Sequence, residues 1–258
     1  MKVVILAGGL GTRISEESHL RPKPMVEIGG MPLLWHIMKY YASFGYHDFI
    51  ICAGYKQNVI KDFFANYHLN HSDVTFDFAK DCQMTVHSTA AEPWRVTVVD
   101  TGLYTMTGGR MKRVQRYLDD EPFFLTYGDG LSDVDLAAEV AFHRAHGRLA
   151  TLLAVQPDSR FGVLDLEGDT VNAFREKSVA DAALINGGFM ILDKRVLPYI
   201  EGDTTVFERG PLEQLCKMRQ LMAFRHGGFW QCMDTLRDKE RLEVLWQSGA
   251  APWKRWQA

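Results

Sequence analysis

The apolar residues of this chain fall into two alternating patterns. Short continuous runs at 3–7, 49–53 and 123–127 predict strands that are buried on both faces. Stripes with a helical period lie between these runs, and the clearest, at 32–44, has a proline in its first turn, where a missing N–H costs little. Further strands are predicted at 74–78, 85–87, 95–99, 151–155, 163–166, 171–175, 188–192 and 221–224. Further helices are predicted at 58–67, 110–118, 134–146 and around Leu242, Leu245 and Trp246.

Alternating strands and helices of this kind predict a three-layer α/β fold around a mostly parallel sheet. No repeat, low-complexity tract or long linker interrupts the pattern, so we expect a single domain over 1–258. In open sheets of this type, ligands bind outside the carboxyl ends of the strands. The loops that follow the strands at 3–7, 123–127 and 188–192 are therefore expected to line one cleft.

The first predicted strand is followed at once by Gly8, Gly9 and Gly11, and two cations stand beyond them. Backbone N–H groups can approach phosphates closely where no side chain intervenes, and Arg13 and Lys23 add the positive charge that a triphosphate needs. The loop does not end in the Gly-Lys-Ser/Thr of a P-loop, and it lacks the third glycine of the dinucleotide-binding pattern. A tight turn would explain the glycines but not the cations. We therefore predict a phosphate-binding loop.

Two aspartates follow strand-like segments later in the chain. Asp129 lies between two glycines directly after the strand at 123–127, and Asp234 follows the aromatic segment at 228–230. Mg²⁺ is commonly held by one or two carboxylates together with phosphate oxygens and waters, so these aspartates could form a metal site. Each also has a plainer interpretation, since Asp129 could belong to a turn and Asp234 could cap a helix beginning near Leu236. The residues alone leave both interpretations open.

Composition narrows the class of protein. Hydrophobic residues make up 47% of the chain and charged residues 24%, as in ordinary globular domains. A net charge of -3 argues against a nucleic-acid partner. No apolar run reaches the length of a membrane span and no signal-peptide pattern precedes the first strand, so we expect a cytoplasmic protein without a membrane partner. The four cysteines are far apart and do not indicate a zinc site.

Taken together, the motifs resemble those of the sugar-1-phosphate nucleotidylyltransferases, and the similarity covers essentially the whole chain. Gly-Gly-x-Gly-Thr-Arg followed by Pro-Lys-Pro is typical of the opening loop of that family. The Thr-x-Thr-Gly-Gly-Arg segment at 105–110 and the Ala-Pro-Trp-Lys tail at 251–254 resemble its cytidylyltransferase branch in particular. Two positions depart from the family pattern: Ser178 replaces the proline of Glu-Lys-Pro, and Cys232 stands where relatives commonly have proline. Further matching segments are 22–30, 100–102, 127–130, 160–162, 185–189, 228–230 and 233–239.

This resemblance implies a Rossmann-like fold of the nucleotide-diphospho-sugar transferase type, with a nucleotide-binding half over about 1–130 and a sugar-phosphate-binding half over about 131–258. It implies an enzyme that uses Mg²⁺ to transfer a cytidylyl group from CTP to α-D-glucose 1-phosphate by in-line attack. The products would be pyrophosphate and CDP-glucose, the latter for polysaccharide biosynthesis such as lipopolysaccharide O-antigen. The same reaction with another nucleoside triphosphate or sugar 1-phosphate is the alternative. A non-catalytic nucleotide sensor is a second alternative, although the charged groups expected of an enzyme are all present.

The resemblance also assigns roles to individual residues. The implied catalytic residues are Arg13, Lys23 and Asp129, and the implied Mg²⁺ ligands are Asp129 and Asp234. The implied nucleotide-binding residues are Leu6, Ala7, Gly8, Gly9, Leu10, Gly11, Thr12, Arg13, Lys23, Thr105, Thr107, Gly108, Gly109, Arg110 and Gly128. The implied sugar-phosphate-binding residues are Glu176, Lys177, Asn186, Gly187, Gly188 and Trp230. Family members are usually homo-oligomers, and Trp94, Trp253 and Trp256 could be buried against another subunit.

Overall fold

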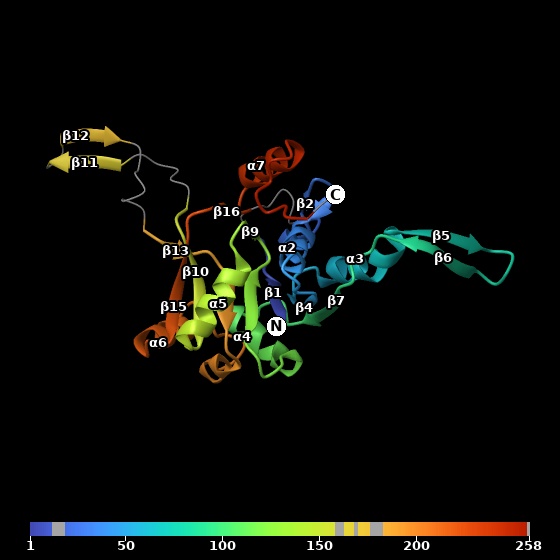
Figure 1. The fold of residues 1–258 in the computed structure, drawn as a ribbon, viewed down its shortest axis with the longest axis horizontal. Helices are drawn as coiled ribbons and strands as arrows, with labels where there is room; N and C mark the ends of the chain where they lie inside the picture. The colour runs from blue at the N-terminus through green and yellow to red at the C-terminus, as the bar shows by residue number, and fades with distance from the viewer. Residues whose placement is uncertain (12–18, 158–162, 168–169, 176–182, 257–258) are drawn as a thin grey trace.

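The computed structural model describes residues 1–11, 19–157, 163–167, 170–175 and 183–256. Its main body is an eight-stranded mixed sheet with helices packed on both faces, and a long two-stranded hairpin projects from one end (Figure 1). The three-layer α/β fold expected from the sequence is therefore confirmed. No helix in the described ranges is long and apolar enough to cross a bilayer.

The centre of the sheet is parallel. β1 pairs in parallel with β4 and with β8, and β7 continues the parallel order beyond β4. β14 lies antiparallel between β8 and β10, so the sheet is mixed at this side. The strands in spatial order are β7 (Arg95–Asp100), β4 (Asp48–Ala53), β1 (Val3–Ala7), β8 (Phe123–Tyr127), β14 (Met190–Leu192) and β10 (Ala150–Val155), with β13 (Ile185–Asn186) and β15 (Leu221–His226) also paired to β10.

Helices and short strand pairs complete the described part of the chain. The α-helices are α2 (Leu33–Ala42), α3 (Gln57–Asn70), α4 (Thr107–Val114), α5 (Leu136–His146), α6 (Pro211–Lys217) and α7 (Leu236–Gln247). Single 3₁₀ turns are η2 (Lys23–Met25) and η3 (Gln115–Tyr117), and η5 (Lys194–Tyr199) is longer. The short antiparallel pairs are β2 (Glu27–Ile28) with β3 (Met31–Pro32), β5 (Ser72–Asp77) with β6 (Gln83–Thr89), β9 (Gly130–Ser132) with β16 (Trp230–Cys232), and β11 (Val163–Glu167) with β12 (Thr170–Arg175).

Neighbouring residues of β1 face opposite hydrophobic cores. Val3 and Ile5 belong to one core, to which α2, α5 and α7 contribute, whereas Val4 and Leu6 belong to a second core with α4 and α6. Side chains alternate between the two faces of a strand, so a strand covered on both faces is apolar at every position. This explains the uninterrupted apolar run that begins the chain, and it places the end of β1 between the two cores.

Three expectations from the sequence need correction. The helix predicted at 110–118 begins earlier, as α4 at Thr107, and ends at Val114. The strand predicted at 188–192 is shorter than expected, because only its last three residues form β14. Trp253 is fully buried within its own chain and stacks on Phe229, so it does not form a subunit surface. Trp94 and Trp256 also pack against the core of this chain but are only partly buried, so their expected place at a subunit contact stays a prediction.

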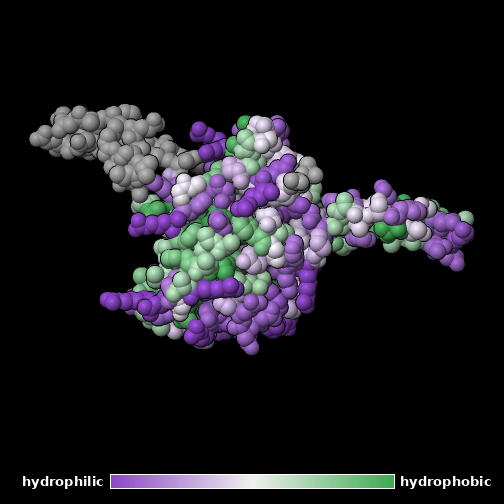
Figure 2. Space-filling view, viewed as in Figure 1, coloured by the Kyte–Doolittle hydropathy of each residue, from purple (hydrophilic) through white to green (hydrophobic). Residues whose placement is uncertain are grey.

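The β5–β6 hairpin carries apolar side chains that remain exposed. Phe78 is 79% exposed, and Phe76 and Met84 are 49% and 48% exposed. Hydrophobic residues lie among hydrophilic ones along the projecting arm in Figure 2. An isolated two-stranded hairpin is at best marginally stable in water, so an arm of this kind needs further contacts to hold its shape.

Candidate active site

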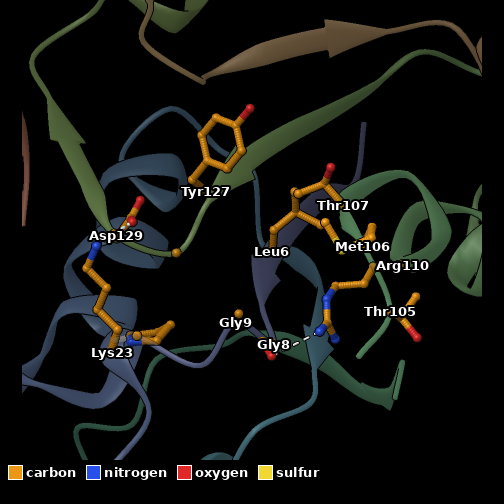
Figure 3. Close-up of a pocket in the computed structure, with 14 residues that line it drawn as sticks. Leu6, Gly8, Gly9, Lys23, Thr105, Met106, Thr107, Arg110, Tyr127 and Asp129 are labelled. Carbon is orange, nitrogen blue, oxygen red and sulfur yellow. Dashed lines mark hydrogen bonds and ion pairs between the residues drawn. The ribbon is translucent and has the colours of Figure 1, made fainter. Parts of the chain in front are cut away.

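Two adjoining cavities open at the carboxyl ends of β1 and β8. The first, of about 370 Å³, lies between the glycine loop after β1 and the start of α4 (Figure 3). The second, of about 360 Å³, lies between β8, β13 and β16. Tyr127 and Asp129 line both cavities and form the wall between them. The first is lined by Leu6, Ala7, Gly8, Gly9, Gly11, Lys23, Pro24, Thr105, Met106, Thr107, Arg110, Tyr127, Gly128 and Asp129. The second is lined by Thr126, Tyr127, Asp129, Gly130, Asn186, Gly187, Phe189, Glu208, Trp230, Cys232 and Asp234.

The buried guanidinium of Arg110 supports the glycine loop. Its Nη2 donates to the carbonyl oxygen of Gly8 at 3.0 Å, as Figure 3 shows, and its Nη1 donates to Thr101 Oγ1 at 2.7 Å and to the carbonyl of Gly102 at 2.8 Å. Burial lowers the pKa of this guanidinium. A Cβ atom on Gly8 would lie only 2.0 Å from Arg110 Nη1, so this packing requires glycine. Arg110 thus lines the first cavity while its charge is held by backbone carbonyls.

Gly108 and Gly109 face away from the first cavity and pack against the segment at 203–205. Their N–H groups both point to the carbonyl oxygen of Thr205, at 2.9 and 3.3 Å. A Cβ atom on Gly109 would lie 2.5 Å from the Cα of Asp203, which is closer than real Cβ atoms approach. The two glycines let α4 begin against this segment, and their N–H groups, which would otherwise lack partners in the first turn, are satisfied there.

Lys23, Asp129 and Asp234 meet at the junction of the two cavities. The Lys23 Nζ lies 2.7 Å from Asp129 Oδ2 and 2.6 Å from Asp234 Oδ1. Burial opposes the charge on Lys23, but the charges and hydrogen bonds of the two carboxylates outweigh burial and raise the pKa of the ammonium. The pairing of β9 with β16 brings the two aspartates together, because Cys232 is opposite Gly130 and the N–H of Met233 donates to the Asp129 carbonyl.

Asp234 does not cap helix α7, which was one of its two interpretations from sequence. The N-cap is Thr235, whose side chain accepts from the N–H of Asp238, while the Asp238 carboxylate accepts from the N–H of Thr235. This reciprocal arrangement is a capping box. It leaves the side chain of Asp234 directed to Lys23 and to the second cavity.

The far side of the second cavity is built by the loop between β13 and β14. The Asn186 Oδ1 accepts from the N–H of Gly188 at 3.0 Å, and Trp230 Nε1 donates to the carbonyl of Gly187 at 2.8 Å. Gly188 has a φ of +77°, and a Cβ there would lie 2.9 Å from the ring of Tyr127. Glycine is therefore needed for both the backbone conformation and the close packing.

Cys232, which departs from the family pattern, lies beside the carboxylates. Its Sγ is 3.6 Å from Asp234 Oδ2, and burial, followed by the charges of Asp234 and Asp129, raises the pKa of its thiol to about 12. The side chain therefore stays a neutral thiol at neutral pH. The hydrogen bond from Met233 to Asp129 is present, so the cysteine is compatible with the approach of the two aspartates.

Several residues named from the sequence lie outside the described ranges, and the structure adds others. Those outside are Thr12, Arg13, Glu176, Lys177 and Ser178. Tyr127 and Glu208 line the cavities but were not among the expected site residues. Tyr127 directly precedes the Gly-Asp-Gly segment, and this position at the end of a strand could have indicated that it lines the site. Glu208 stands in no motif, and only the tertiary structure reveals it.

Comparison with known proteins places this geometry in a family. The sequence model of the family described as Nucleotidyl transferase matches residues 2–226. The chain is 58% identical to the glucose-1-phosphate cytidylyltransferase of Salmonella typhi, over 100% of both chains. It is 40% identical to a probable glucose-1-phosphate cytidylyltransferase of Bacillus subtilis (strain 168), over 99% of this chain and 100% of that one.

Solved structures show the same architecture. HddC from Yersinia pseudotuberculosis, in a crystal structure complexed with GMP-PN, has a TM-score of 0.69 and 26% sequence identity, covering 95% of this chain and 99% of that one. The chain belongs to the nucleotidyl transferase family. The resemblance to sugar-1-phosphate nucleotidylyltransferases expected from the motifs is confirmed, as is the Rossmann-like fold that it implied.

Proposed function

We propose that this chain transfers a cytidylyl group from CTP to α-D-glucose 1-phosphate and releases pyrophosphate, giving CDP-glucose. The observation that carries the proposal is the identity of 58% over the full length of both chains with a glucose-1-phosphate cytidylyltransferase. The site supports it, because two cavities of similar volume adjoin at a cluster of one ammonium and two carboxylates. A transfer between two substrates is accelerated when both are held side by side in the right orientation, which adjoining cavities allow.

CTP fits the first cavity. In the glycine loop after β1, no side chains shield the backbone N–H groups. These groups can therefore approach the phosphates of a triphosphate closely. Lys23 contributes a positive charge at the end of the cavity that faces the second one. We propose that Arg13 and Thr12, together with Leu10, extend this surface, as the family pattern implies. On the opposite side, Thr105, Thr107 and Arg110 form the wall available to ribose and base.

The sugar phosphate fits the second cavity. Its wall combines the amide of Asn186 and the phenol oxygen of Tyr127, which can bond sugar hydroxyls, with the ring of Trp230, whose N–H is already bonded to Gly187 and which offers an apolar face. We propose that Glu176 and Lys177 complete this site, with the lysine holding the phosphate. The phosphate end of the substrate would then lie toward Lys23, next to the first cavity.

The chemistry needs alignment and positive charge more than proton transfer. An oxygen of the sugar phosphate attacks the α-phosphorus of CTP, and pyrophosphate leaves in line. This nucleophile is already an anion near neutral pH, since the second phosphate pKa is about 6. Lys23 stands where the two anionic substrates meet, so its charge offsets their repulsion and stabilises the charge that develops on the phosphoryl oxygens.

Nucleotidyl transferases generally use a divalent metal, and we propose Mg²⁺ with Asp129 and Asp234 as its ligands. The donor set fits, because the two carboxylates already converge on one cation, the ammonium of Lys23. Two carboxylates, with the remaining positions filled by phosphate oxygens and waters, are a usual arrangement for Mg²⁺. When bound, the ion would supply additional positive charge to the phosphate oxygens.

The test is pyrophosphate release by the purified protein with CTP and glucose 1-phosphate, in Mg²⁺ or in EDTA. UTP, GTP, ATP and dTTP are compared under the same conditions. Turnover with CTP alone that EDTA abolishes supports the proposal, and Asp129→Asn and Lys23→Ala should then be strongly impaired. Turnover with another triphosphate would overturn the base assignment, whereas CTP binding without pyrophosphate release would indicate a nucleotide sensor.

We further propose a homo-oligomer in which a second copy covers the β5–β6 hairpin. The exposed side chains of Phe76, Phe78 and Met84 on an arm that needs further contacts support this. The double variant Phe76→Ser/Phe78→Ser should have a lower mass by light scattering than the wild type. Val244→Ser, which alters an exposed apolar residue of α7, is the matched control. Equal masses for all three proteins would argue against this interface.

A further inference from the structure

Glu208 connects the walls of the two cavities through hydrogen bonds from two hydroxyl groups. Its Oε1 accepts from the hydroxyl of Tyr127 at 2.6 Å, and its Oε2 accepts from Thr107 Oγ1 at 2.6 Å. Thr107 lines the first cavity, Glu208 lines the second, and Tyr127 lines both. The carboxylate of Glu208 therefore links Thr107, in the first cavity, to Tyr127, in the wall between the two cavities.

The backbone around Glu208 is held firmly against helix α4. The N–H of the preceding residue, Phe207, donates to Thr107 Oγ1 at 2.9 Å, and the Phe207 side chain is fully buried. A short way upstream, Thr205 accepts the N–H groups of Gly108 and Gly109. The hydroxyl of Thr107 thus accepts from the backbone and donates to the carboxylate. Glu208 has a defined position from which to orient Tyr127.

Tyr127 lines both cavities, so the position of its ring affects the shape of both. Its ring lies against Gly188, where a Cβ would come within 2.9 Å, so the ring has little room to move in that direction. The Tyr127 hydroxyl donates to Glu208 Oε1 at 2.6 Å, and this bond sets the direction of the phenol group. Asn186 contacts the same hydroxyl at 3.4 Å. The direction of the phenol therefore depends chiefly on its short bond to Glu208.

We propose that Glu208 is a positioning residue of the transfer reaction, acting through Tyr127 and Thr107 to fix the wall between the two substrates. This inference rests on the proposed function, which puts CTP and the sugar phosphate on opposite sides of that wall. A displacement of about 1 Å at such a place can cost on the order of 100-fold in rate, because the reacting atoms lose their alignment. Glu208 would thus act on alignment while making no contact with the reacting atoms.

The experiment compares Glu208→Ala with Glu208→Gln in steady-state kinetics. Glutamine can accept from one hydroxyl and donate to the oxygen of the other, so it can preserve the link without the charge. We expect Glu208→Ala to lower kcat at least about tenfold and Glu208→Gln to stay within about threefold of wild type. Calorimetric binding of CTP and the thermal midpoint are measured for each variant, and both should change little. Glu213→Ala, an exposed acidic residue in α6, is the matched control.

A second comparison tests whether Glu208 acts through its two partners. In a Tyr127→Phe/Thr107→Val background both hydroxyl donors are absent, so adding Glu208→Ala should cost less than about threefold more. Full additivity would overturn the proposal, as would a kcat for Glu208→Ala within about twofold of wild type. Equal losses in the alanine and glutamine variants would show that the charge itself matters, which also overturns it. All ratios are measured with the triphosphate that the wild type turns over, so a wrong base assignment is recognised separately.

Discussion

Replacing Lys23 with methionine tests how the junction between the two cavities works. The ammonium lies 2.7 and 2.6 Å from the carboxylates of Asp129 and Asp234, and the three side chains are 10%, 29% and 22% exposed. At an effective dielectric constant of about 20, each contact represents roughly 6 kcal/mol of attraction before desolvation is subtracted. Removing one partner of a fully buried pair costs about 3–5 kcal/mol. The carboxylates can take up some water here, so we expect a loss of about 2 kcal/mol in the free energy of unfolding.

The same substitution should separate stability from catalysis. Loss of a cation at the developing phosphoryl charge should lower kcat by about 10²–10³-fold. Without the ammonium, the two carboxylates repel each other and should bind Mg²⁺ more tightly, so added Mg²⁺ should raise the thermal midpoint of Lys23→Met more than that of wild type. Urea unfolding, thermal melts with and without Mg²⁺, and pyrophosphate release measure the three quantities.

The control is Lys39→Met, which removes another partly buried ion pair, that between Lys39 and Glu92, neither of which lines a cavity. It should lose stability while keeping kcat and the Mg²⁺ response of wild type. The reasoning about the junction is refuted if Lys23→Met keeps kcat within about threefold of wild type. It is refuted equally if Mg²⁺ raises the midpoints of Lys23→Met and wild type by the same amount.

Three further predictions concern the packing around the site and the core. Gly109→Ala should lower the free energy of unfolding, measured by urea denaturation, by about 2 kcal/mol, because the added Cβ would collide with Asp203. This loss should outweigh the better helix propensity of alanine, and an unchanged free energy would contradict the close packing. Glu139→Met should raise the free energy of unfolding by about 1–2 kcal/mol at pH 8, since both oxygens of this fully buried carboxyl lack partners among the described residues. Burial raises the pKa of this carboxyl, so the gain should grow as pH rises above 4.5 and be smallest in acid, where the group is neutral in both states. Burial lowers the pKa of His36 to about 4, so its contribution to stability is present above the unfolded value of about 6.5 and is lost as pH falls toward 4. The unfolding midpoint of the wild type relative to that of His36→Asn should therefore fall between pH 7 and 4, and a constant difference between the two proteins would contradict this.

Local patterns in the sequence were sufficient for much of the fold. The apolar run at the start of the chain predicted β1 to the residue, because a strand between two cores must be apolar on both faces. The glycines after it predicted a loop that can approach phosphates, and the loop lines the first cavity. These features depend on neighbours in the chain, which a sequence displays directly. The family resemblance depended on the same kind of local motif.

The tertiary structure alone decided which distant groups meet and which partners each side chain contacts. The pairing of β9 with β16 brings Asp129 and Asp234 together at Lys23, which no local pattern indicated, and their role as metal ligands stays a prediction. Gly108 and Gly109 allow α4 to pack on a segment far along the chain, which their motif did not indicate, and their predicted place beside the nucleotide stays a prediction. A motif specifies residue types and spacing, but the direction of a side chain and the identity of its distant partner follow from how the whole chain packs.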